Sequence, residues 1–174
     1  MVRKTVGIVI ATAASFILFT GQAPKIKAAE DVCERNGKVA NLNFTVKDIN
    51  GKDVALSAFK GSVILLDFWA TWCPPCKREI PGFIQLYNTY KSRGLVVLGV
   101  SVDDSTSDVQ KFIKQYKMNY PVLIGNDRDD LQRAFAPMPG YPTTFVISRN
   151  GRICLQHTGF MPLEQFEQKI KALL

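Results

Sequence analysis

The chain has 174 residues, of which 47% are hydrophobic and 21% are charged. This composition fits one folded domain with a buried core and short N-terminal segments, and it excludes an intrinsically disordered chain. Part of the formal charge of +7 comes from the N-terminal segment, where four basic residues precede the first acidic residue, Glu30. No basic run is interleaved with aromatic residues, so nothing indicates a nucleic-acid partner.

Residues 1–29 have the features of an export leader. Arg3 and Lys4 precede a largely apolar run from Val6 to Phe19. The uncharged stretch 5–24 has about 20 residues, a length that can span a bilayer, so a cleaved signal peptide and an uncleaved anchor are both open. In either case we expect the folded part to lie outside the inner membrane, in the periplasm or another extracytoplasmic space, where disulfides form.

A polar extension at residues 30–41 precedes the expected domain at 42–174. Alternating apolar residues over 42–46 and the Asn50-Gly51 turn predict a hairpin that returns over 52–56, and Ser57 is expected to cap a single helical turn. Further strands are expected at residues 63–69, 95–102, 120–124, 143–148 and 152–158, and helices at 73–94, 109–116, 131–135 and 163–173. Strands that alternate with helices predict an α/β sheet covered on both faces.

Two cysteines lie where the buried strand 63–69 passes into a helix. Cys73 and Cys76 are separated by two prolines, a spacing typical of reversible disulfide chemistry. Cys73 would lie at the helix N-terminus, where unpaired N–H groups and the helix dipole favour a thiolate. Pro74 suits the first helical turn because its missing N–H is not needed there. An inert disulfide and half of a metal site are the alternatives.

Two motifs resemble a known family. One resembles a thioredoxin-fold active site and reads Asp67-Phe68-Trp69-Ala70-Thr71-Trp72-Cys73-Pro74-Pro75-Cys76-Lys77. The other resembles the cis-proline loop of that fold and reads Tyr141-Pro142-Thr143-Thr144-Phe145. With the leader, the hairpin, Glu79 and the segment 95–124, the chain over about 40–174 resembles the TlpA/ResA-like thiol–disulfide oxidoreductases. The resemblance implies a thioredoxin fold, with a central mixed sheet flanked by helices, an N-terminal β-hairpin and a central α/β insert, and it requires no cofactor or metal.

Four residues are expected to carry the chemistry. Cys73 would be the nucleophile and the more exposed sulfur, and Cys76 would resolve the mixed disulfide. Asp67 lies inside an apolar strand, so burial should raise its pKa and let it accept the Cys76 proton. Glu79 would share the helical face of Cys76, and the resemblance implies that it tunes the cysteine pair. Alternatively, Asp67 reaches solvent at a sheet edge and Glu79 is an ordinary solvated residue.

The expected substrate-binding residues are Trp72, Pro74, Tyr141 and Pro142. A cis prolyl bond at Pro142, facing the disulfide, would present the Tyr141 backbone to an extended substrate for strand-like pairing. A plain turn proline is the alternative. Trp72 is expected to pack near the sulfurs together with Trp69, which could also be simple core filling.

Two further cysteines, Cys33 and Cys154, invite a structural disulfide that would pin the extension to the strand 152–158. Two free thiols, or a bond to a partner, are the alternatives. A zinc site that adds Cys154 and His157 to the first pair is disfavoured, because strand alternation directs these two side chains to opposite faces.

We expect the protein to reduce disulfides of envelope proteins. The resemblance implies apocytochrome c, before haem attachment, as one candidate substrate, and a membrane thiol reductant as electron donor. A thiol peroxidase of the same fold is one alternative, but its P-x-x-x-T-x-x-C pattern is absent because Leu66 and Ala70 occupy the two positions. A non-catalytic binding module is another, and the intact cysteine pair argues against it.

Overall fold

This computed structural model describes residues 33, 35–102 and 105–174. The first two strands that pair in the chain form a short hairpin. Strands β1 (Thr45–Lys47) and β2 (Asp53–Ala55) are antiparallel. The carboxylate of Asp48 accepts hydrogen bonds from the backbone N–H groups of Asn50 and Lys52. Gly51 has a φ of +78°, a conformation that glycine adopts without a steric cost. The Asn50-Gly51 turn is therefore the one that the sequence predicts.

A five-stranded mixed sheet follows. Its strands are β3 (Val63–Trp69), β4 (Leu95–Ser101), β5 (Val122–Ile124), β6 (Thr143–Ile147) and β7 (Ile153–Thr158), in the order β5-β4-β3-β6-β7. β3 is parallel to β4, and β4 to β5, whereas β6 is antiparallel to both β3 and β7. All seven residues of β3 are buried, as expected for a central strand with both faces covered.

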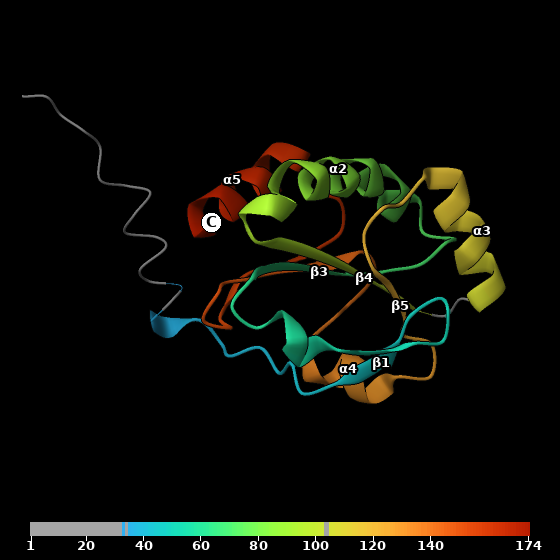
Figure 1. Cartoon of the computed structure of the whole chain (residues 1–174), viewed down its shortest axis with the longest axis horizontal. Helices are drawn as coiled ribbons and strands as arrows, with labels where there is room; N and C mark the ends of the chain where they lie inside the picture. Colours follow the sequence, from blue (N-terminus) through green and yellow to red (C-terminus); the bar gives the residue numbers. More distant parts are fainter. Residues whose placement is uncertain (1–32, 34, 103–104) are drawn as a thin grey trace, which may run out of the picture.

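Helices cover both faces of this sheet. They are α2 (Pro74–Tyr90), α3 (Thr106–Tyr116), α4 (Asp129–Ala134) and α5 (Leu163–Leu173). Figure 1 shows α2 and α5 on one side of the sheet, and α4 with the hairpin on the other. The predicted fold class is thereby confirmed, with the hairpin at the start and the β4–α3–β5 unit as the central insert.

Local predictions are wrong at several element ends, and α4, for example, begins at Asp129 and not at Leu131. Residues 42–44 lie outside β1, because the partner strand β2 pairs only with 45–47. No side chain caps the single turn η1 (Leu56–Phe59), which follows Ala55 instead of beginning at Ser57. β5 begins at Val122 and not at Tyr120, since Pro121 has no N–H to contribute to the sheet.

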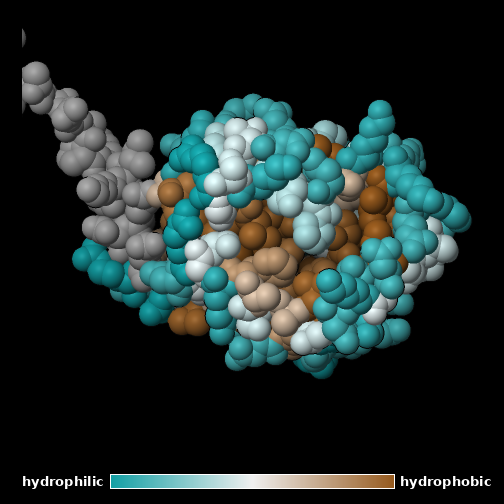
Figure 2. Space-filling model, viewed as in Figure 1, coloured by the Kyte–Doolittle hydropathy of each residue, from teal (hydrophilic) through white to brown (hydrophobic). Residues whose placement is uncertain are grey.

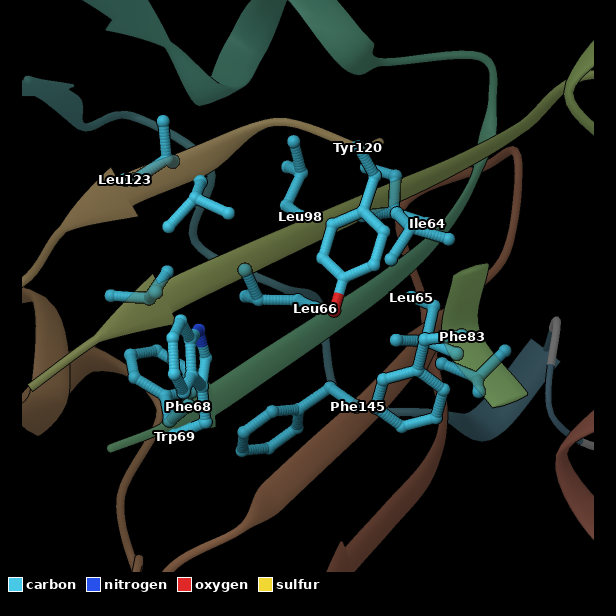
Figure 3. Packing of buried hydrophobic residues seen from close by; sticks show 14 of the residues in the cluster. Ile64, Leu65, Leu66, Phe68, Trp69, Phe83, Leu98, Tyr120, Leu123 and Phe145 are labelled. Carbon is cyan, nitrogen blue, oxygen red and sulfur yellow. The ribbon is translucent and has the colours of Figure 1, made fainter. Parts of the chain in front are cut away.

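The core fills the space between the sheet and its covering layers. On β3, the ring of Phe68 lies 5.7 Å from that of Phe135 and 6.0 Å from that of Phe145, measured between centroids. Figure 3 shows Phe68 and Phe145 among the buried side chains around β3. Figure 2 shows apolar residues gathered in the middle of the visible face, with polar residues above and below them. The end of β3 is therefore held by close packing from both sides.

The described part of the N-terminal extension lies along the edge strand β7. Val39 forms an antiparallel bridge with Arg152. The N–H of Ala40 donates to the carbonyl of Gly151, and the N–H of Ile153 donates to that of Lys38, both at 2.9 Å. The predicted leader and anchor lie outside the described residues. Within 33, 35–102 and 105–174, no helix has both the length and the apolar character needed to cross a membrane.

Candidate active site

The cysteine pair lies where the central strand β3 passes into α2. Cys73 is the N-cap residue of α2, and Pro74 is its first helical residue. Cys73 and Cys76 form a disulfide. The backbone N–H of Cys76 donates to Cys73 Sγ at 3.3 Å. Helix N-terminal donors of this kind stabilise a negatively charged sulfur.

Exposure does not distinguish the two cysteines in this oxidised state. Cys73 is 2% exposed and Cys76 is 1% exposed, which differs from the expectation that Cys73 is the more exposed. The disulfide holds both sulfurs against the core, while the neighbouring Trp72 is 56% exposed. The assignment of the nucleophile therefore depends on the position of Cys73 at the end of the helix.

The proline loop lies beside the cysteine turn. The Tyr141–Pro142 bond is cis, and Thr143 in β6 pairs with Phe68 near the end of β3. The rings of Trp72 and Tyr141 meet edge to face, with 6.4 Å between their centroids. The hydroxyl of Tyr141 donates to Gln132 Oε1 in α4 at 2.8 Å. Trp72 and Tyr141 thus form one aromatic surface next to the disulfide.

Asp67 is a buried acid in the central strand. It is 2% exposed and lies between Gly99 of β4 and Thr144 of β6. The Thr144 hydroxyl donates to Asp67 Oδ1 at 3.0 Å. Burial raises the Asp67 pKa well above its ordinary value, the charge of Glu79 raises it further, and the Thr144 hydrogen bond opposes both effects. The alternative that Asp67 reaches solvent at a sheet edge is wrong.

Glu79 is buried as well, on the first turns of α2. It is 4% exposed, and its Oε1 accepts the backbone N–H of Met161 at 2.6 Å. Burial raises the Glu79 pKa to about 7, although the Met161 hydrogen bond and the charge of Arg78 lower it. The alternative of an ordinary solvated helix residue is therefore wrong.

Sequence reasoning missed three groups at this site. The sequence pattern assigns Thr144 only to the proline loop, although a polar residue in a buried strand signals a hydrogen-bond partner. The backbone N–H of Met161 leaves no signal in the sequence. The third group is Tyr120, which is 6% exposed. Burial raises the pKa of its phenol, and the charges of Asp67 and Glu79 raise it further.

The other expected disulfide partners also meet. Cys33 is bonded to Cys154 at the edge of β7, so Cys154 has no free thiol for a metal. His157 pairs with Thr144 across the strands. Within the described part of the chain, no three His, Cys, Asp or Glu side chains cluster in a way that could hold a metal ion.

A disulfide that caps a helix after the central strand, beside a cis-proline loop, defines a thioredoxin-fold thiol–disulfide oxidoreductase. The chain belongs to the AhpC/TSA family, which it matches over residues 37–156. It is 32% identical over 171 residues to the thiol-disulfide oxidoreductase ResA of Bacillus cereus, covering 98% of this chain and 94% of that protein. Over 119 residues it is 41% identical to ResA of Bacillus subtilis, covering 68% and 65% of the two chains.

A solved structure gives the same result. The putative thiol:disulfide interchange protein DsbE from Chlorobium tepidum has a TM-score of 0.72 and 38% identity, over 79% of this chain and 97% of that one. The resemblance found in the sequence is confirmed, and the protein is a thiol–disulfide oxidoreductase of the ResA/DsbE type.

Proposed function

We propose that this protein reduces disulfides of envelope proteins, with Cys73 as the nucleophile and Cys76 as the resolving thiol. The observation that carries the proposal is the Cys73–Cys76 disulfide at the N-terminus of α2, with the buried acids Asp67 and Glu79 on β3 and α2, the two elements that meet at the disulfide. An inert disulfide requires neither buried acid.

The reaction has two exchange steps. The Cys73 thiolate attacks one sulfur of the partner's disulfide, which forms a mixed disulfide and releases the partner's other sulfur as a thiolate. Cys76 then loses its proton and attacks Cys73 Sγ, so that the bond to the partner breaks. The partner gains two electrons and leaves as a dithiol, and the protein is left with the Cys73–Cys76 disulfide.

The proton of Cys76 goes to a buried carboxylate. A general base works best when its pKa is near the working pH, and burial raises the Glu79 pKa to about 7. Asp67 is the second candidate, since the same effect raises its pKa well above the usual range. The charge of Glu79 raises the Asp67 pKa, so ionisation of Glu79 disfavours ionisation of Asp67, and we assign the two acids as one proton-accepting pair.

Substrate is expected to bind at the aromatic surface beside the disulfide. Trp72 and Pro74 are exposed there, and Tyr141 is half-buried next to the buried Pro142. An extended peptide would pair with the backbone at Tyr141 and pack on the Trp72 ring. Apocytochrome c before haem attachment is one candidate, and a membrane thiol reductant would return the protein to the dithiol state.

The proposed location is extracytoplasmic, with residues 1–29 as a signal peptide or signal anchor and stretch 5–24 as the membrane segment of the anchored form. Residues 30–41 would be the extension, and 42–174 the catalytic domain. The Cys33–Cys154 bond fits this location, because structural disulfides persist in oxidising compartments.

Insulin reduction by a supplied dithiol tests the exchange activity. We expect the wild type to accelerate it and Cys73→Ser to return the rate to background. The Cys33→Ser/Cys154→Ser double variant is the matched control, since it removes the other disulfide and should keep the activity. Equal rates for Cys73→Ser and wild type would contradict the proposal. Hydrogen peroxide consumption at background would set aside the peroxidase alternative.

Covalent trapping tests the order of attack. In Cys76→Ser the mixed disulfide cannot be resolved, so envelope proteins should remain bound to Cys73 until a reductant releases them. Trapping by Cys73→Ser instead would reverse the two roles. A Cys73–Cys76 reduction potential close to about −270 mV would support the direction of electron flow, whereas one close to about −120 mV would indicate a disulfide donor.

A further inference from the structure

Three buried side-chain atoms have no hydrogen-bond partner within the described residues. They are Trp69 Nε1, Glu79 Oε2 and the Tyr120 hydroxyl. Buried polar groups are nearly always satisfied by protein or ordered water, because leaving them unpaired costs free energy. Each such exception therefore calls for an explanation, such as a catalytic role or an ordered water.

The indole of Trp69 and the phenol of Tyr120 meet over Gly99. This glycine pairs with Asp67 in the register between β4 and β3. A Cβ atom at Gly99 would lie 2.9 Å from Trp69 Nε1 and 3.4 Å from Tyr120 Cε2. Two aromatic side chains thus occupy the space that a side chain at residue 99 would take. Figure 3 shows the Tyr120 ring reaching over the sheet with its hydroxyl oxygen directed toward β3.

We propose that Tyr120 is a positioning residue in a buried proton-transfer network, in which its hydroxyl donates through a buried water to the ionised member of the Asp67–Glu79 pair. The inference rests on the proposed role of this pair as the acceptor of the Cys76 proton. It assigns the network's hydrogen-bond donor to a residue outside the cysteine motif and outside the proline loop.

The phenol remains a donor across the working pH range. Burial, Asp67 and Glu79 all raise the Tyr120 pKa, so the hydroxyl keeps its proton. The titratable and charged groups on the elements around it are Asp67 from β3, Glu79, Arg78 and Tyr87 from α2, Tyr116 from α3, the Cys73–Cys76 pair, and Asp48, Lys52 and Asp53 of the hairpin, which line a pocket together with Tyr120. Tyr87 packs edge to face on Tyr120, with 6.4 Å between centroids. No cationic side chain on this list is buried, which leaves a neutral donor to stabilise the carboxylate.

Glu79 connects the network to solvent. It is one of the residues that line a pocket of about 360 Å³ between α2 and the loop before α5, together with Arg78, Phe160, Met161 and Leu163. A proton that Cys76 gives to the acid pair could leave through this pocket. The buried Asp67 does not line this pocket, and Tyr120 lines a different one beside the hairpin, so Glu79 is the acid of the pair that is placed to exchange protons with water.

The direction of the effect follows from the donor's role. A hydrogen bond to a carboxylate stabilises its ionised form, so loss of the phenol hydroxyl should make the acid pair hold its proton more tightly. The carboxylate would then be available only at higher pH. Loss of a hydrogen bond to a charged carboxylate raises its pKa by about one unit or more. We therefore expect the pKa on the acid side of the pH–rate profile of the Cys76 step to rise by about one unit.

The test separates the two exchange steps. Reduced protein is mixed with an excess of 5,5′-dithiobis(2-nitrobenzoate) between pH 5 and 9. The first, concentration-dependent release of thionitrobenzoate reports attack by Cys73. The second, concentration-independent release reports attack by Cys76. Tyr120→Phe should raise the pKa that defines the acid limb of the second phase by about one unit and leave the pKa of the first phase unchanged. Tyr87→Phe is the matched control, because it removes a hydroxyl from the adjoining ring, and it should follow the wild type in both phases.

A second variant keeps the test decisive if Tyr120→Phe folds poorly. Site-specific 3-fluorotyrosine at position 120 makes the phenol a stronger donor, so it should move the acid limb of the second phase downward. If the wild type shows an acid limb in the second phase and neither substitution changes its pKa, the role of Tyr120 is overturned but that of the acid pair is not. A wild type without an acid limb in the second phase would instead overturn the proton-acceptor role of the acid pair, and this inference with it.

Discussion

At the scale of single residues, the site contains two buried acids, Asp67 and Glu79. Asp67 and Glu79 come from different elements, and each keeps one hydrogen bond, from Thr144 and from the Met161 backbone respectively. Desolvation of a carboxylate is costly unless it is protonated or well bonded. These positions therefore favour the protonated form in the folded protein, and stability should depend on pH through them.

Glu79→Gln should stabilise the protein at alkaline pH. Burial raises the Glu79 pKa from 4.5 to about 7, so between these values the folded state holds a proton that the unfolded state has lost. The wild type must then lose stability as the pH rises from 4.5 to about 7. Glutamine keeps the acceptor for Met161 and carries no titratable proton. We expect its free energy of unfolding at pH 8 to exceed that of the wild type by up to about 3 kcal/mol.

Urea denaturation at pH 4.5 and pH 8 measures this difference. Below pH 4.5 the two proteins should have similar stability, because the wild-type residue is then protonated in both states. Glu164→Gln is the control: Glu164 is exposed on α5 and this variant keeps Glu79, so its stability should equal that of the wild type at both pH values. A Glu79→Gln advantage that is the same at both pH values would contradict the pKa argument.

At the scale of elements, the end of the sheet opposite the cysteines is tied together by one side chain. Arg149, in the β6–β7 turn, donates to the carbonyls of Gly61, Arg93 and Leu174 at 3.3, 2.9 and 3.3 Å. Gly61 lies shortly before β3, Arg93 lies shortly before β4, and Leu174 follows α5. One guanidinium therefore fixes the starts of the two central strands relative to the last helix.

Arg149→Ala should destabilise the fold without affecting the chemistry. Three carbonyls lose a charged donor, and we expect the free energy of unfolding to fall by about 1–3 kcal/mol. Thermal unfolding and insulin reduction measure the two effects. Arg133→Ala is the matched control, because Arg133 is exposed and only pairs with Asp129 at 3.7 Å, and it should cost less than about 1 kcal/mol. Equal losses for the two variants would mean that Arg149 does not tie these segments.

At the scale of the whole molecule, the Cys33–Cys154 disulfide joins the extension to the sheet edge over a separation of 121 residues. A closed loop of this length restricts the unfolded chain, which in the chain-entropy model stabilises the fold by about 4–5 kcal/mol as an upper value. The bond lies on β7, whereas the redox pair lies at the end of β3. Stability and exchange chemistry should therefore be separable.

The Cys33→Ser/Cys154→Ser variant should have a lower melting temperature and an unchanged rate of insulin reduction. Circular dichroism at a fixed pH measures the first, and the turbidity assay measures the second. The single Cys33→Ser variant serves as the comparison, because it should melt at about the same temperature as the double variant. A melting temperature equal to that of the wild type would show that the bond does not stabilise the fold.

Much of the arrangement is local and could be predicted from the sequence. The apolar run Val63–Trp69 forms a buried strand with the expected bounds, and Cys73 caps the helix that begins at Pro74. The element ends were less predictable, because strand length depends on the partner: β1 begins only at Thr45, because its partner strand β2 ends at Ala55.

The sequence by itself determined the thioredoxin-like order of elements, the cysteine pair and the presence of two acids near it, since each follows from neighbours along the chain. Only the tertiary structure decided how those acids behave. Thr144 and Met161 reach them from 77 and 82 residues away, and Tyr120 comes from a third segment. The pKa of a carboxyl group depends on the water it loses and the donors it gains, and both are set by segments that only folding brings together.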